Sequence, residues 1–395
     1  MAAGEKPYRV YRGGRTKGKV PLQRRTTPTG RGSSGRDGGE PGRAAVRRPR
    51  RRWSWKRRIG VAVLVLVVFL IVWGAVGYLA VRSGVRSAHK RLPAGTETAL
   101  TKQNGLLLSH SSYILLLGTD HSQLAARAGD RHSDSIMLLR TDPGRHRLIY
   151  LSIPRDLRVP IPGHGDDKIN TAYQIGGPAL AIKTVEGFTG LPVNHVVIVD
   201  FADFESLIDK IGGVQINVPE PILSNRFDCP YSTASRCGEW KGWRFRKGVQ
   251  TMDGHRALIY SRIRENRLNP AESDVTRGER QQQVMQALLS KLASVGTFFR
   301  LPFVGGDLLK PITTDLSTNS FLQLGWIKFR ASGSSTLHCR LGGTATDIGG
   351  GSYLISTEEN RSVIQMVQGN SAPQPPPPGS GPFGPGCVVG SQRFK

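Results

Sequence analysis

An uncharged run of 23 residues, Ile59 to Val81, constrains this 395-residue chain more than any other feature. Its length allows a helix to cross the hydrocarbon core of a bilayer with some tilt. Trp53, Trp55, Trp73 and Tyr78 lie toward its two ends, where interfacial aromatic residues occur. A cleaved signal peptide fits less well, because the run exceeds the usual apolar length and no clear A-x-A site follows. We therefore predict a transmembrane helix over residues 59–81.

The charge on either side of this run predicts its orientation. Residues 1–58 hold 19 Lys or Arg and only 3 Asp or Glu, and few aliphatic residues with which to build a core. We expect a disordered basic tail in the cytoplasm, with residues 82–395 outside the cell. Basic clusters beside a membrane helix usually bind anionic lipid headgroups, so lipid is the expected partner of this tail. Nucleic acid is the lesser alternative, and no specific nucleic acid is expected because the tail has no folded reader.

Three apolar runs follow within a short stretch: YILLLG from Tyr113, SIMLL from Ser135 and LIYLSI from Leu148. Continuous apolar runs of about five residues are typical of strands buried on both faces. Charged residues stand where these runs begin or end, namely Asp120, Asp134 and Arg155. Two carboxylates and an arginine at one rim of a sheet suit a divalent cation and a phosphate. Taken singly, each of the three is better explained as a solvated strand end.

Strand-like and helix-like segments alternate through the rest of the chain, which favours an α/β fold. We predict a single three-layer α/β/α domain with a central mixed sheet, preceded by one transmembrane helix. The predicted divisions are a tail at 1–58, the transmembrane helix at 59–81, a stalk at 82–110, the globular domain at 111–367 and a disordered Pro/Gly-rich tail at 368–395.

The longest predicted helix runs from Asp274 to Ser294. One of its faces changes from polar to apolar, with Arg277 and Gln281 preceding Val284 along the same stripe. The four cysteines lie after the apolar run, where an oxidising environment permits disulfides. Cys229 and Cys237 are the favoured pair. The pairing of Cys339 and Cys387 stays open, with each other as the first assumption.

Several common catalytic signatures are missing from the sequence: the G-x-S-x-G elbow, the P-loop and the H-E-x-x-H helix. The sequence does contain several arginines near predicted turns and helix starts. Together with the aspartates named above, they predict a site for a pyrophosphate and its cation.

At this point the order of the motifs resembles that of the LytR-CpsA-Psr family. The motifs are LLLGTD, SDSIML, SIPRD, KINTAYQIGG, NHVVIVDFADFESLIDKIGGV, GVQTMDGHRALIYSR and RGERQQQV. The resemblance is strong over about residues 111–295 and continues weakly to about 367. High Gly, Arg and Ala content also suggests an actinobacterial source.

The resemblance implies a membrane-anchored phosphotransferase. Such an enzyme moves a glycopolymer with one phosphate from a polyprenyl-pyrophosphate lipid to the muramic acid of peptidoglycan, with Mg²⁺ as cofactor. Carried onto this sequence, Asp120 and Asp134 match the Mg²⁺ ligands, and Asp134 is also the suggested base. The implied pyrophosphate ligands are Arg131, Arg155, Arg262, Arg264, Arg277 and Gln281, of which Arg155, Arg262 and Arg264 act in catalysis with Asp134. Asp274 and Lys168 are expected in supporting positions.

One departure from the family pattern concerns Arg131. His132 separates it from Ser133, whereas the family usually has Arg directly before Ser-Asp, so we rank Arg131 below Arg155. Three other functions compete with the transferase: a regulator, a non-catalytic module that binds wall or lipid, and a pyrophosphate hydrolase in which water replaces the sugar hydroxyl.

Overall fold

The fold is described by a computed structural model covering residues 54–121, 131–269, 274–380 and 383–390. The side chains of five predicted site residues lie outside this description: Asp120, Arg131, His132, Asp134 and Asp274. The basic tail at 1–53 also lies outside it.

A seven-stranded mixed sheet forms the centre of the domain, in the order β11-β6-β1-β2-β3-β12-β15. Its strands are β1 (Tyr113–His121), β2 (Arg131–Asp142), β3 (Arg147–Ile153), β6 (His195–Asp200), β11 (Ile312–Thr314), β12 (Leu337–Arg340) and β15 (Gly386–Val389). β1 pairs with β6 and β3 with β12 in parallel, and the other neighbours are antiparallel.

Successive residues of the central strands point into two separate cores, which explains their unbroken apolar sequences. Ile114 and Leu116 of β1 are buried in one core, and Leu115 and Leu117 are buried in the other. The first core is shared with α3 (Phe201–Lys210), α5 (Gly254–Arg262), α6 (Asp274–Leu292), α7 (Val295–Leu308) and α8 (Thr318–Arg330). The second is shared with α2 (Thr171–Thr189) and α9 (Glu359–Gln368).

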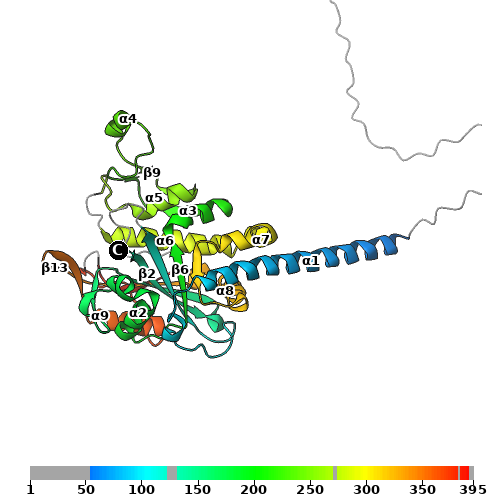
Figure 1. The fold of residues 1–395 in the computed structure, drawn as a ribbon, viewed down its shortest axis with the longest axis horizontal. Coiled ribbons are helices and arrows are strands. Elements are labelled where there is room, and N and C mark those ends of the chain that lie inside the picture. The colour runs from blue at the N-terminus through cyan, green and yellow to red at the C-terminus, as the bar shows by residue number, and fades with distance from the viewer. Residues whose placement is uncertain (1–53, 122–130, 270–273, 381–382, 391–395) are drawn as a thin grey trace, which may run out of the picture. The chain divides into compact units, whose positions relative to one another are not determined.

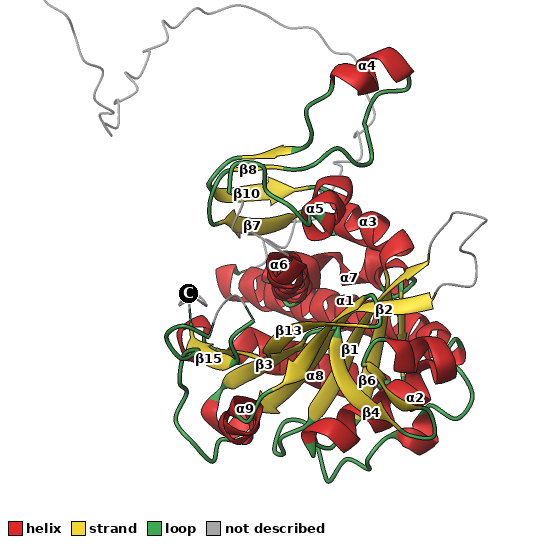
Figure 2. Cartoon of the chain, turned by 90° about the vertical axis from the view of Figure 1, so that its left-hand side faces the viewer, coloured by secondary structure: helices red, strands yellow, loops and turns green. Residues whose placement is uncertain are grey.

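Figure 2 shows the resulting layers, with α3, α5 and α6 on one side of the sheet and α2 and α9 on the other. The predicted three-layer α/β/α fold is therefore confirmed. Smaller sheets lie outside the central one: β7 (Val214–Val218) with β10 (Gly248–Met252), β8 (Ile222–Leu223) with β9 (Arg244–Phe245), and β13 (Gly343–Ile348), β14 (Gly351–Ser356), β4 (Leu157–Ile161) and β5 (Gly165–Lys168) in that order. The short helix α4 (Ala234–Glu239) lies between β8 and β9.

The apolar run near the N-terminus lies within α1 (Trp55–Lys90), which is long and apolar enough to cross a membrane. The helix continues past the predicted boundary at residue 81. Val81, Val85 and Ala88 are buried, the first two in the core that contains α7. The first part of the predicted stalk is therefore a helix packed against the domain, drawn in blue in Figure 1.

The C-terminal segment corrects a second prediction. Residues 368–395 were expected to be disordered, yet β15 closes one edge of the central sheet. Cys387 of β15 is bonded to Cys339 of β12, directly opposite it in the ladder. Cys229 and Cys237 form the second disulfide, as predicted. Proline-rich composition thus misled the prediction here, because a four-residue strand and one disulfide are enough to fix the segment.

His338 provides a pH-dependent contribution to stability. It stacks on the buried Tyr150 ring at 5.6 Å, and Nε2 of Gln286 lies 3.0 Å from its Nδ1. Burial, and secondarily the charge of Lys328, lower the pKa of His338 to about 4. In the unfolded chain its pKa should be about 6.5.

We therefore expect unfolding free energy to be independent of this histidine above about pH 6.5 and to fall as the pH drops toward 4, because only the unfolded chain takes up the proton. The loss should be on the order of 3 kcal/mol. Chemical denaturation of the full chain between pH 7 and 4 measures it. His338→Gln should flatten the profile, whereas a matched change at the exposed His255 should not; equal profiles for the two variants would exclude this origin.

Candidate anion-binding site

The ends of three central strands meet at one edge of the sheet. Because β2 is antiparallel to both β1 and β3, the end of β1, the start of β2 and the end of β3 coincide. The backbone of Asp120 pairs with that of His132. The register shifts after Gly118, so that Ser133 and Ser135 pair with consecutive residues of β1 and Asp134 is left between them. The backbone thus places both predicted aspartates at the rim from which Arg155 emerges.

The turn after β3 holds a compact group of charges. Nε of Arg155 lies 3.3 Å from Oδ2 of Asp156, and Nζ of Lys168 lies 2.9 Å from Oδ1 of the same carboxylate. One carboxylate therefore restrains two cationic side chains from different elements. Sequence analysis predicted Lys168 as a supporting residue and did not single out Asp156, whose role depends on β5 folding back beside the turn.

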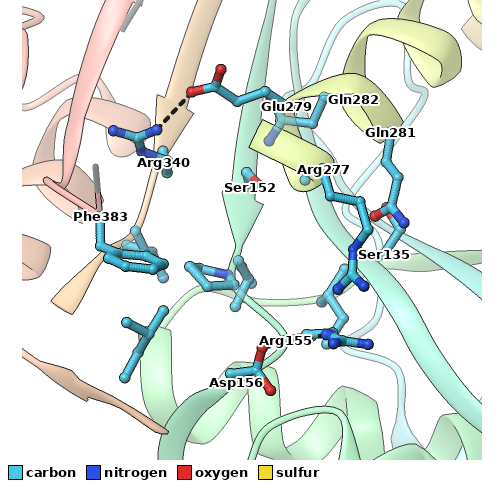
Figure 3. Close-up of a pocket in the computed structure, with 16 residues that line it drawn as sticks. Ser135, Ser152, Arg155, Asp156, Arg277, Glu279, Gln281, Gln282, Arg340 and Phe383 are labelled. Atoms are coloured by element: carbon cyan, nitrogen blue, oxygen red, sulfur yellow. Dashed lines mark hydrogen bonds and ion pairs between the residues drawn. The ribbon is translucent and has the colours of Figure 1, made fainter. Parts of the chain in front are cut away.

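The first turns of α6 supply the facing wall of a cavity. Arg277 and Gln281 are four residues apart, so they project from one face of the helix. Arg277 is 6% exposed and Gln281 is 9% exposed, and both line the cavity together with Arg155 and Ser135. Figure 3 shows Arg277 and Gln281 reaching from α6 toward the guanidinium of Arg155. Three of the predicted pyrophosphate ligands are thus brought together from segments more than 120 residues apart in the sequence.

A second charged pair lies on the other side of this cavity. Nη1 of Arg340 is 2.7 Å from Oε1 of Glu279, and its Nε and Nη2 donate to the carbonyl oxygen of Gly384 at 3.2 and 2.9 Å. Burial lowers the pKa of Arg340, and Glu279 opposes that shift. Sequence analysis missed this pair. The sequence offered little signal for it, because Arg340 ends a four-residue strand that also contains His338.

Arg262 and Arg264 occupy a different position from the three ligands above. Arg262 is the last residue of α5 and Arg264 follows the helix, and neither lines this cavity. Nη1 of Arg262 lies 3.3 Å from Oδ2 of Asp228, which belongs to the segment with the Cys229–Cys237 disulfide. Arg280 of α6 donates to the carbonyl oxygen of Ile263 at 3.0 Å, so this segment is held against the helix that carries Arg277. The roles predicted for Arg262 and Arg264 stay predictions.

The described part of the cavity can bind an anion with several oxygens. Arginine side chains present forked donors suited to phosphate oxygens, and the Gln281 amide adds a neutral donor. Leu354 and Phe383 give the opposite part of the lining an apolar character. The site therefore suits a phosphorylated ligand with an apolar portion. The chain is thus an α/β protein with a long apolar helix and a cavity whose donor set suits a phosphate.

Comparison with known proteins then gives the family. The LytR_cpsA_psr family model matches residues 78–368, so the chain belongs to the LytR-CpsA-Psr family. The match begins inside α1 and includes the stalk. TagU of Oceanobacillus iheyensis, named a polyisoprenyl-teichoic acid–peptidoglycan teichoic acid transferase, is 30% identical over 82% of this chain and 96% of its own length.

Solved structures of family members are similar in fold. The structure titled TagT bound to LIIa-WTA matches with a TM-score of 0.54 and 28% identity, over 69% of this chain and 95% of the other. YwtF (TagT) of Bacillus subtilis with bound octaprenyl pyrophosphate lipid matches with a TM-score of 0.50 and 26% identity, over 70% and 96%.

Breaking the Glu279–Arg340 pair should destabilise the fold. Glu279→Gln leaves the buried Arg340 without its carboxylate, and we expect a loss of about 1–3 kcal/mol in unfolding free energy. Denaturant titration of the full chain measures the change. The double variant Glu279→Gln/Arg340→Met should recover part of it, because no buried charge is left unpaired. An additive or larger loss in the double variant would contradict this account.

Proposed function

We propose that this protein transfers a glycopolymer, together with one phosphate, from a polyprenyl-pyrophosphate lipid to the muramic acid of peptidoglycan. The observation that carries the proposal is the cavity in which Arg155, Arg277 and Gln281 converge. The octaprenyl pyrophosphate lipid bound to YwtF and the transferase name of TagU support this ligand and this reaction class.

The proposed reaction is a displacement at the phosphorus next to the glycan. The acceptor hydroxyl oxygen forms a bond to this phosphorus, and the bond to the bridging oxygen breaks. The lipid leaves as its monophosphate, and the hydroxyl proton passes to a carboxylate, for which Asp134 is our candidate. Arg155 and Arg277 stabilise the charge on the phosphoryl oxygens, and Gln281 adds a hydrogen bond that orients them.

The contacts around the cavity support positioning by restrained side chains. Asp156 limits the movement of Arg155 and Lys168, since it contacts both. Arg277 is almost fully buried on a helix that is itself tied to the segment after α5 by Arg280. Fixed donors of this kind need little reorganisation as charge develops on the phosphate, which is the main electrostatic advantage of an enzyme site over water.

A divalent cation belongs to the proposal as the partner of Asp120 and Asp134. Carboxylate oxygens are suitable ligands for Mg²⁺, and the strand register puts the two backbones close together at the rim. When bound there, the ion would add positive charge that offsets the charge of the pyrophosphate. Among the described residues no group of three or more His, Cys, Asp or Glu side chains is placed to hold a metal ion, and the side chains of Asp120 and Asp134 lie outside those residues.

The proposed location is the outer side of the cell membrane. α1 suggests single-pass anchoring. The basic residues that precede it favour a cytoplasmic N-terminus, and the two disulfides of the domain fit an oxidising compartment. Contact of the basic tail with anionic lipids stays a prediction, as does the expectation that it has no specific nucleic-acid partner.

Replacing Arg155 tests the reaction. Arg155→Lys keeps the charge and loses the fork of donors, so we expect transfer to fall at least about 100-fold. The full chain in proteoliposomes would receive a short glycan on a polyprenyl pyrophosphate, peptidoglycan oligomers and Mg²⁺. Mass spectrometry of the muramic acid products reports the phosphodiester. Arg158→Lys, three residues further on and outside the cavity lining, is the matched control and should change the rate less than about twofold.

Each other outcome of this assay selects a competing function. Lipid monophosphate without a glycan conjugate, lost in Arg155→Lys, identifies a hydrolase. Tight lipid binding without turnover for several polymers identifies a binding module. Normal transfer by Arg155→Lys would show that this cavity is not the reaction site.

Replacing Asp120 tests the cation. We expect chelation by EDTA to stop transfer and Asp120→Asn to raise the Mg²⁺ concentration needed for half-maximal rate at least about 10-fold, because one charged ligand is lost. Asp166→Asn, at an exposed position of β5, should leave this concentration unchanged. Full activity in EDTA would remove the cation from the proposal.

A further inference from the structure

α7 exposes large apolar side chains that the cavity does not use. Phe303 is 76% exposed, and Phe299 and Val295 are more than half exposed. They belong to one helix, spaced by four residues, so they form a single apolar stripe. Water contact over such a stripe is unfavourable by roughly 25 cal/mol per Å², so its exposure calls for an apolar partner.

The stripe is attached to the membrane helix. The rings of Phe303 and Trp73 meet at 5.4 Å in an edge-on arrangement. Further along, α7 approaches α1 closely through small residues. A Cβ added to Gly305 would lie 3.2 Å from that of Ala80, and one added to Gly84 would lie 2.9 Å from Cδ1 of Leu309. The two helices therefore run in the same direction along this interface, side by side in Figure 1.

The end of this interface is fixed by hydrogen bonds from Arg91, just after α1. Its Nη2 donates to the carbonyl oxygens of Leu309 and Ile312 at 2.9 and 2.6 Å. Ring contact, close packing at glycines and hydrogen bonds thus connect α1 and α7 at several positions. These contacts fix the position of the apolar stripe along the axis of α1.

The stripe contacts α1 at Trp73, which lies inside the apolar run. Trp73 precedes Val81 by eight residues, or about 12 Å along a helix axis. Phe303 contacts Trp73, so it lies at the level of the hydrocarbon when residues 59–81 span the bilayer. Phe299 and Val295 precede Phe303 in a helix that runs parallel to α1, so they lie deeper in the hydrocarbon than Phe303 does.

We propose that α7 inserts its apolar stripe, Val295, Phe299 and Phe303, among the lipid acyl chains that surround α1. The occupant of this surface is phospholipid, because the stripe continues the surface of α1, whose residues 63–72 are broadly exposed in the same way. The domain then has a second membrane contact beside its transmembrane helix.

This contact sets the orientation of the cavity. α6 carries Arg277 near its start and ends three residues before α7 begins. From Arg277 to Leu292 the helix rises about 22 Å. Insertion of α7 therefore fixes the C-terminal end of α6 at the bilayer. The N-terminal end of α6, which carries Arg277, is then held at a set distance from that point.

Single introduced cysteines test the insertion, because all four native cysteines are in disulfides. The full chain in liposomes would carry Phe299→Cys or Phe303→Cys labelled with a polarity-sensitive fluorophore. We expect phospholipids with brominated acyl chains to quench each label at least about threefold more than they quench a label at Val249→Cys, an exposed position on β10. Aqueous iodide should show the reverse order.

Ile71→Cys on α1 is the reference for anchoring, being 65% exposed in the apolar run. Quenching at Ile71 with none at Phe299 and Phe303 beyond the Val249 value would overturn the insertion of α7 while leaving the transmembrane helix intact. Loss of quenching at Ile71 as well would overturn both the span and the insertion that rests on it. Neither outcome depends on transferase activity, so the proposed reaction is tested separately.

Discussion

Antiparallel pairing of β1, β2 and β3 is the constraint on which the cavity depends. This ladder is buried on both faces, so its register is fixed by two cores at once, and a slip of one residue would move apolar side chains of both cores. The same ladder brings the end of one strand, the start of the next and the end of the third to one rim. The apolar residues of the strands fix the register, and the register brings the charged residues at the strand ends close together.

Cationic side chains gathered at this rim need compensation within the protein. Asp156 restrains Arg155 and Lys168, and Glu279 pairs with the buried Arg340. Removing charges from water costs several kcal/mol per ion, and only part of this is recovered by a paired carboxylate. A site built in this way favours a multiply charged anion over a neutral ligand, which agrees with a pyrophosphate carrier.

Much of the fold and part of the site were predictable from sequence because their signals are local. Apolar runs gave the central strands, and the spacing of Arg277 and Gln281 gave one wall of the cavity. Arg155 was marked by its place after a buried strand. Asp156, Glu279 and Arg340 were missed, because their roles arise from contacts between distant segments.

The two boundary errors have a common cause. Composition predicted a stalk at 82–110 and a disordered tail at 368–395, yet residues 82–90 and 386–389 are ordered by packing on the domain. Ala88 has no exposed surface, and Cys387 is 1% exposed. Tertiary contacts of this kind leave no periodic signal in a short segment. The same limit applies to α7, whose packing beside α1 gives no signal in its own sequence.

The place of β15 has a consequence for biosynthesis. It is the last strand of the described residues, and it covers the edge of β12. Until it is made, β12 presents unpaired backbone groups and the thiol of Cys339, a combination that invites pairing with another chain. A chain terminated before residue 386 would thus have nearly the whole domain and yet be prone to form mixed-disulfide oligomers.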